Sequence, residues 1–323
     1  MIYILFVIGF VLLIKGADLL VDGASAIAKK YNISELVIGL TIVSFGTSMP
    51  ELVVNILASA DGSSELAIGN ILGSNVANVL LILGIAAIIK PLPIQKSIYF
   101  TEIPISLTAI LLVGFLANAN LFAEVKGLSL SRIDGAILLS FFGLFMTYIF
   151  VVSKNKTSNG EADTSQESDI KDYSNGKAIL LTIIGSFALF LGGKWVVEGA
   201  FEIALLFGLS ETFIGLTVVA IGTSLPELVT SAIAAKKGQA DLAVGNVIGS
   251  NIFNVLWILG ISAVIRPLPF FVVSNTDILM VVLSSTMLIF AVIIGKKPRI
   301  DRWEGAVFVL VYLLYISYLV MRG

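Results

Sequence analysis

Apolar residues recur along the chain in windows of about 20, the length that an α-helix needs to cross the hydrocarbon core of a bilayer. The pattern predicts ten helices, over residues 2–27, 34–58, 66–89, 98–117, 131–152, 178–206, 211–235, 241–265, 274–295 and 303–321. We therefore expect an all-α polytopic membrane protein with ten transmembrane helices. Because no basic segment precedes residues 2–27, we interpret them as a retained first helix rather than a signal peptide.

The sequence repeats itself at an offset of 176 residues. IGLTIVSFGTSMPELV at 38–53 matches IGLTVVAIGTSLPELV at 214–229, and LAIGNILGSNVAN at 66–78 matches LAVGNVIGSNIFN at 242–254. Each half holds five predicted helices. Since five is an odd number of crossings, the second half starts on the opposite face of the membrane. The pattern therefore predicts two inverted five-helix repeats.

A polar segment, 153–177, separates the two halves and is rich in Ser, Asn, Gly and acidic residues, a composition typical of a flexible linker. The repeats then span 1–152 and 178–323, with their matching motifs in 38–78 and 214–254. Of the 20 Lys and Arg residues, 14 fall in connections on the linker side and four on the other side. The positive-inside rule thus predicts a cell-membrane protein with a cytoplasmic linker and both termini outside.

Composition agrees with a membrane protein and narrows the chemistry. Hydrophobic residues make up 57% and charged residues 13%, against about 45–50% and about 25% in globular domains. The chain has no Cys and no His, which excludes disulfides, thiolate or imidazole metal sites and Ser-His-Asp catalysis. The formal charge of −2 gives no sign of nucleic-acid binding. We expect neither an enzyme nor a cofactor; the oligomeric state stays open.

A proline interrupts the second predicted helix of each repeat, in GTSMPE at 46–51 and GTSLPE at 222–227. Proline has no N–H to donate, so the helix should kink or break there. Broken backbone at this depth is tolerated where it lines a polar cavity or packs on protein. We expect the backbone carbonyls of Ser44 and Ala220 to be free to face a cation.

Glu51 and Glu227 follow these prolines near the middle of otherwise apolar spans. A carboxylate at the bilayer centre costs at least about 2.5–3.5 kcal/mol, so an unpaired one without a function is improbable. Neither helix holds a basic residue deep in its span to neutralise it. The expected counter-charge is a bound cation, or protons when the site is empty.

The third helix of each repeat carries a polar stripe. Ser74 and Asn78 share one face at i, i+4, as do Ser250 and Asn254. Asn residues extend the stripe by a turn (Asn70, Asn246) or lie to one side of it (Asn75, Asn251). Each motif alone is typical of a structural kink or of helix packing. Their doubling around two carboxylates favours an all-oxygen site for hard cations such as Ca²⁺ or Na⁺.

Other charged residues lie nearer the ends of the spans. Lys15, Asp18 and Asp22 on the first helix can pair at i, i+3 or i, i+4, as can Lys194 and Glu198 on the sixth. We interpret them as structural pairs near the membrane interface, with a role in ion access as the alternative.

The paired GTSMPE…GSNVAN and GTSLPE…GSNIFN segments resemble the two alpha-repeats of the sodium/calcium exchanger family, in the calcium/cation antiporter superfamily. The resemblance covers essentially the whole chain and is to the compact prokaryotic form. It implies ion ligands at twelve positions, the last two through backbone carbonyls: Thr47, Ser48, Glu51, Ser74, Asn78, Thr223, Ser224, Glu227, Ser250, Asn254, Ser44 and Ala220.

What the resemblance implies is exchange of Na⁺ for Ca²⁺ across the lipid bilayer by alternating access. Asn254 stands where potassium-dependent members have Asp, which leans against potassium dependence. A Ca²⁺/H⁺ or other cation/H⁺ antiporter using the same site is the alternative. A cation channel is less favoured, because its filter would more naturally lie at an oligomer axis.

Overall fold

The computed structural model describes residues 2–121, 127–158, 171, 173–207, 220–294 and 298–322, most of which are helical. The first repeat consists of five helical segments, some of them divided by π-helical turns (η1 to η3). In chain order these are α1 (Ile2–Tyr31); α2 (Glu35–Ile38), η1 (Gly39–Val43), α3 (Ser44–Thr47) and α4 (Met49–Asp61); α5 (Ser64–Ala77), η2 (Asn78–Ile82) and α6 (Leu83–Ile89); η3 (Ile98–Glu102) and α7 (Ile103–Ala117); and α8 (Arg132–Ser158).

The second repeat follows the same order. Its described segments are α9 (Asn175–Leu206); α11 (Ala220–Thr223) and α12 (Leu225–Lys237); α13 (Ala240–Ile252), η6 (Phe253–Ile258) and α14 (Leu259–Ile265); α15 (Ser274–Ile294); and α16 (Arg302–Arg322). Within the described residues, eight helices are long and apolar enough to cross a membrane, and a bent pair over residues 35–61 makes a ninth. The span predicted at 211–235 is described only from Ala220 onward, so the count of ten stays a prediction.

The proline-containing segments break where the sequence predicts. The helix over 35–61 bends by 50° between Thr47 and Met49, with Pro50 in the first turn of the new helix. In the second repeat α11 ends at Thr223 and α12 begins at Leu225, again with the proline in its first turn. Each new helix therefore has its N-terminus in the middle of the molecule, two residues before a buried glutamate.

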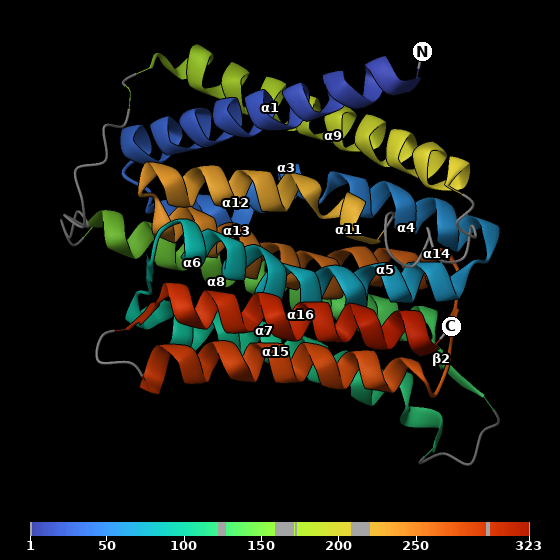
Figure 1. Cartoon of the computed structure of the whole chain (residues 1–323). Coiled ribbons are helices and arrows are strands. Elements are labelled where there is room, and N and C mark those ends of the chain that lie inside the picture. The colour runs from blue at the N-terminus through green and yellow to red at the C-terminus, as the bar shows by residue number, and fades with distance from the viewer. Residues whose placement is uncertain are drawn as a thin grey trace.

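The helices form three layers (Figure 1). Helices α1 and α9 lie side by side on one face, α7, α15 and α16 cover the opposite face, and α8 runs behind the middle layer, where it packs against α14. The broken segments of both repeats, with α5, α6, α13 and α14, lie between them. Both ends of the chain lie at the same end of the helix bundle. The two repeats are thus interleaved rather than placed as separate domains.

Short strands that the sequence analysis did not predict tie the two repeats together at both ends. β1 (Leu92–Pro93) pairs antiparallel with β4 (Arg299–Ile300), and β2 (Leu128–Leu130) pairs antiparallel with β3 (Leu268–Phe270). In each sheet one strand comes from either half of the chain. The hydrophobic pattern missed them because two or three residues are too few to show an alternation.

Glycines allow the closest helix contacts, and these too occur in matching pairs. A Cβ built on Gly16 would lie 2.9 Å from the carbonyl oxygen of Gly185, and one on Gly192 would lie 2.8 Å from that of Gly9. On the opposite layer, Gly305 of α16 approaches the carbonyl of Gly84 in the same way. Small residues let membrane helices pack backbone to backbone, and they do so here between the two halves.

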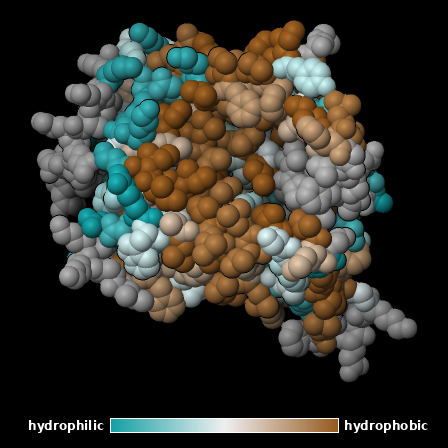
Figure 2. All heavy atoms as spheres, in the orientation of Figure 1, coloured by the Kyte–Doolittle hydropathy of each residue, from teal (hydrophilic) through white to brown (hydrophobic). Residues whose placement is uncertain are grey.

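The outer surface is mostly apolar. Hydrophobic side chains cover a broad band across the middle of the molecule, and hydrophilic ones gather at the end where α1 and α12 terminate (Figure 2). Exposed hydrophobic side chains among the described residues include Ile4, Phe115, Phe150, Phe187 and Leu314. Such a surface is stable in lipid rather than in water.

The segment between the two helices is shorter than the linker predicted over 153–177. Helix α8 continues to Ser158 and α9 already begins at Asn175. A helix can continue through polar residues once it has left the membrane. Residues 159–170 and 172, the greater part of the linker, lie outside the described residues.

We predict that Gly185→Ala destabilises the fold, because its Cβ would lie 2.5 Å from the backbone nitrogen of Leu20 on α1. Overpacking of this kind costs about 1–3 kcal/mol, and the midpoint of thermal unfolding in detergent should fall by several degrees. The matched control is Gly143→Ala on α8, where no atom lies within 4 Å of the new Cβ. Equal midpoints for the two variants would contradict this account of the α1–α9 contact.

Candidate cation-binding site

The four segments that cross in the middle layer bring the predicted site residues together. Each of the ten predicted side-chain ligands is at most 5% exposed. They come from α3 and α4 (Thr47, Glu51) with Ser48 at the break between them, from α5 and η2 (Ser74, Asn78), from α11 and α12 (Thr223, Glu227) with Ser224 between them, and from α13 and η6 (Ser250, Asn254). Residues 176 positions apart thus meet at one place, as inverted repeats require.

Hydroxyl groups of one repeat contact those of the other. The Ser48 hydroxyl donates to Oε1 of Glu227 at 2.9 Å and lies 3.0 Å from the Ser250 hydroxyl. In the symmetric position, the Ser224 hydroxyl lies 3.2 Å from that of Ser74. Glu51 in turn accepts from these two serines. Each carboxylate is therefore contacted by a serine of the opposite repeat and by one of its own repeat.

Asn75 and Asn251, which the sequence places to one side of the stripe, join the two third helices. Asn78 donates to Oδ1 of Asn251 at 2.9 Å, and Asn254 donates to Oδ1 of Asn75 at 3.0 Å. The side-chain amides of Asn75 and Asn251 donate to each other's backbone carbonyls at 3.2 and 3.4 Å. Because the amide nitrogens of Asn78 and Asn254 are used in this way, their oxygens are turned away from the contact.

Four buried acceptor oxygens at the centre form no hydrogen bond within the described residues. They are Oε2 of Glu51, Oε2 of Glu227, Oδ1 of Asn78 and Oδ1 of Asn254. Buried polar atoms without a partner are rare and costly in folded proteins. These four are all acceptors and form two symmetric pairs, so the group that would satisfy them is a cation, a proton or a donating water molecule.

The predicted backbone carbonyls differ between the repeats. Breaking the helix does not leave the Ser44 carbonyl without a hydrogen bond: its oxygen accepts the Ser48 N–H at 2.9 Å and lies 3.3 Å from the Thr47 hydroxyl, so one lone pair is used within the helix. The helix bends there without losing this bond. In the second repeat the Ser224 N–H donates to Ile221 at 3.2 Å instead of to the matching Ala220.

Wide turns place the two asparagines that the sequence predicts as ligands. The π-helical turn η2 begins at Asn78, and η6 begins at Phe253 and includes Asn254. Such turns insert one extra residue into a helix and are frequent at functional sites. The sequence analysis missed them, since one inserted residue does not change the apolar pattern of a buried helix. Among the described residues, no group of three or more Asp or Glu side chains is placed to hold a metal ion.

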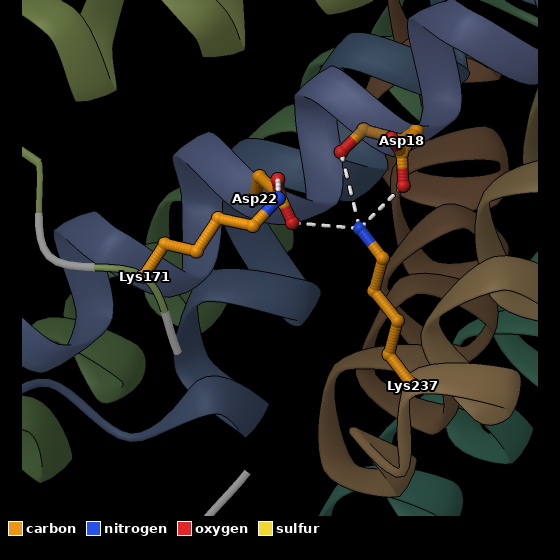
Figure 3. Close-up of polar contacts among 4 residues, drawn as sticks. All are labelled: Asp18, Asp22, Lys171 and Lys237. Carbon is orange, nitrogen blue, oxygen red and sulfur yellow. Dashed lines mark hydrogen bonds and ion pairs between the residues drawn. The ribbon is translucent and has the colours of Figure 1, made fainter. Parts of the chain in front are cut away.

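An ion-pair cluster lies at the end of the bundle where α1 and α12 terminate (Figure 3). Lys237 at the end of α12 lies 2.6 Å from both Asp18 and Asp22 of α1, and Lys171 lies 2.9 Å from Asp22. The predicted pairing within the first helix was thus wrong for Asp18, because tertiary packing brings Lys237 of α12 to it instead of Lys15. The pair Lys194–Glu198 on α9 is confirmed at 3.7 Å, with both side chains about half exposed.

The fold and the site together define a membrane transporter class: interleaved repeats that enclose a buried cluster of oxygen ligands. The sodium/calcium exchanger protein family matches residues 1–151 and 177–321. The chain therefore belongs to the sodium/calcium exchanger family.

Individual relatives extend over nearly the whole chain. The putative antiporter CaxA of Alkalimonas amylolytica is 37% identical over 311 residues, which cover 95% of both proteins. The sodium/calcium exchanger MaX1 of Methanosarcina acetivorans is 37% identical and covers 97% of both. A solved structure of the sodium-calcium exchanger NCX_Mj, soaked with Na⁺ and Ca²⁺, is 34% identical with a TM-score of 0.78, over 97% of this chain and 96% of that one.

Proposed function

We propose that this protein exchanges Na⁺ for Ca²⁺ across the cell membrane by alternating access. Membership of the sodium/calcium exchanger family and the likeness to NCX_Mj support antiport of Ca²⁺ against another cation. The observation that carries the proposal is the set of four unpartnered acceptor oxygens, two from carboxylates and two from amides, at the crossing of the broken helices.

The charge of the site suits a shared binding place. Glu51 and Glu227 are each 1% exposed and form no ion pair with a basic residue in the described part of the chain. Their two negative charges balance one Ca²⁺ or about two Na⁺, so the two cargoes compete for the same ligands. The surrounding hydroxyl and amide oxygens suit such hard cations. The remaining ligand positions, Thr47, Ser48, Ser74, Thr223, Ser224 and Ser250 with the carbonyls of Ser44 and Ala220, belong to this proposal.

The mobile part in this proposal is the pair α1 and α9, which form their own layer against the rest of the bundle (Figure 1). Helix α1 packs more closely against α12 than α9 does against the matching α4. The ion pairs of Lys237 with Asp18 and Asp22 join α12 to α1 at the end of the bundle where α12 terminates (Figure 3). We assign it to the cytoplasmic side, following the positive-inside rule, so that the cytoplasmic path is the closed one.

The opposite end carries the same three positions, with the charge exchanged at two of them. At the offset of 176 residues, Asp18, Asp22 and Lys237 correspond to Lys194, Glu198 and Asp61. Asp61, at the end of α4, is exposed and has no ion pair within the described residues, while Lys194 pairs with Glu198 of its own helix. When the layer moves to close the outer side, the inverted repeat brings Lys194 towards Asp61.

We predict that proteoliposomes loaded with Na⁺ take up ⁴⁵Ca²⁺ until the Na⁺ gradient is dissipated. Vesicles loaded with K⁺ at equal pH should take up none, because no countertransported ion is supplied. A third set carries a pH gradient without Na⁺. Uptake driven by the pH gradient alone would replace Na⁺ by H⁺ as the coupling ion, and conduction of Ca²⁺ without any counter-ion would indicate a channel.

Glu51→Gln or Glu227→Gln should reduce Na⁺-driven Ca²⁺ uptake to the level of empty vesicles. Each change keeps the shape of the side chain but removes one of the two negative charges that offset a divalent cation in a low-dielectric site. Glu202→Gln, which alters an exposed carboxylate on α9 outside the proposed site and the ion-pair clusters, is the matched control and should leave uptake unchanged. Robust exchange by either of the two site variants would refute the assignment.

Lys237→Gln should loosen the closed end of the molecule, because it removes both ion pairs with α1. Partly buried pairs of this kind contribute about 1 kcal/mol, so amide hydrogen exchange at residues 18–31 should become about fivefold faster. The neighbouring Lys236→Gln changes the charge equally but removes no ion pair within the described residues. Faster exchange in both variants, or in neither, would contradict a role for the cluster in closure.

A further inference from the structure

Two threonines of the proposed site have hydroxyl groups whose direction matters. A hydroxyl can donate its proton or offer lone pairs, and a cation is bound only by the lone pairs. The Thr47 hydroxyl lies 3.1 Å from Oδ1 of Asn246, and the Thr223 hydroxyl lies 3.2 Å from Oδ1 of Asn70. In both cases the neighbour comes from the opposite repeat.

In the second repeat a chain of hydrogen bonds behind Asn246 decides which way the amide faces. The Ser231 hydroxyl donates to the backbone carbonyl of Ala243 at 3.4 Å, and the Asn246 amide nitrogen donates to that hydroxyl at 3.0 Å. A backbone carbonyl only accepts, so the direction of every bond in the chain follows from it. The Asn246 amide oxygen therefore faces Thr47, and Thr47 must donate.

The first repeat reaches the same result with a different residue. The Asn55 amide nitrogen donates to the carbonyl of Ala67 at 3.0 Å, which leaves its oxygen to accept from Asn70 at 2.7 Å. The Asn70 oxygen then faces Thr223, which must donate. Asn55 and Ser231 occupy equivalent positions, 176 residues apart. Both are fully buried, so water does not compete for these bonds.

The alternative acceptor for the Thr47 proton is the carboxylate itself, since the Thr47 hydroxyl also contacts Glu227. A proton donated there would occupy a lone pair that the cargo needs and would turn the threonine lone pairs away from the cargo. Donation to Asn246 avoids both effects. A third acceptor near Thr47 is the Ser44 carbonyl at 3.3 Å, one turn earlier on the same helix. A proton donated there would also point away from Glu227.

We propose that the pairs Asn246–Ser231 and Asn70–Asn55 are positioning residues, which hold the protons of Thr47 and Thr223 away from the cargo so that both hydroxyls present lone pairs to it. The proposal rests on the proposed cation site and extends it by four residues that need not touch the ion. The two repeats use different side chains, Asn and Ser, but their hydrogen bonds run in the same direction.

The test measures binding of ⁴⁵Ca²⁺ to the purified protein, together with thermal unfolding with and without Ca²⁺. Ser231→Ala removes the acceptor for Asn246, and the Ca²⁺ concentration for half-saturation should rise about threefold to tenfold, as expected for one lost hydrogen bond. Ser231→Thr keeps the hydroxyl and should stay within about twofold of wild type. Likewise Asn55→Ala should weaken binding, whereas Asn55→Ser installs the residue that the other repeat uses and should retain it.

A double-mutant cycle separates positioning from general destabilisation. Ser231→Ala should have no further effect on Ca²⁺ binding in a Thr47→Val background, where no hydroxyl proton remains to be directed, but should keep its full effect in a Thr223→Val background. A structural role would lower the unfolding midpoint without Ca²⁺ and leave the Ca²⁺-induced increase in that midpoint unchanged.

The outcomes distinguish this proposal from the proposed function. If the wild-type protein shows no saturable Ca²⁺ binding, the proposed function itself fails. If wild type binds Ca²⁺ and Ser231→Ala and Asn55→Ala bind it equally well, or if Ser231→Ala acts equally in both threonine backgrounds, the positioning proposal alone is overturned.

Discussion

The structure is organised around two carboxylates that lie in the middle of the molecule and have no basic partner among the described residues. Glu51 and Glu227 are almost fully buried, and in a medium of low dielectric constant an uncompensated charge is very costly. Serine hydroxyls of the opposite repeat offset part of this cost. The breaks before both glutamates place the N-termini of α4 and α12 beside them, where the helix dipole also favours a negative charge. The remaining charge is left to the cargo in the function that we propose.

The inverted repeat supplies this environment by using each contact twice. The strand pairs, the glycine contacts between α1 and α9, and the exchange of amides between Asn75 and Asn251 all join one half of the chain to the other. Neither half encloses a complete site by itself. Where the halves differ, the difference is chemical. Lys237 and Asp18 form an ion pair, and the equivalent positions of the other repeat, Asp61 and Lys194, carry the opposite charges.

Much of the fold could be predicted from the sequence, for particular physical reasons. Helices that cross a bilayer need long apolar windows, and a proline in such a window interrupts its hydrogen bonds; both signals are local. The strands over 92–93 and 299–300 and the π-helical turns at Asn78 and Asn254 could not be predicted. They consist of only a few residues, and they form because of contacts with distant parts of the chain rather than because of local preference.

The same division holds for the site. The sequence by itself determined the duplicated motifs, the two carboxylates within apolar spans and a chain without Cys or His, because residue identity and spacing carry that information. Only the tertiary structure decided how the groups are partnered: that Lys237 pairs with Asp18 and Asp22, that the Ser44 carbonyl keeps its helical bond, and which oxygens of Asn78 and Asn254 stay unpaired. Hydrogen-bond direction depends on what each donor meets across the fold, and the residues that meet here are more than 170 positions apart.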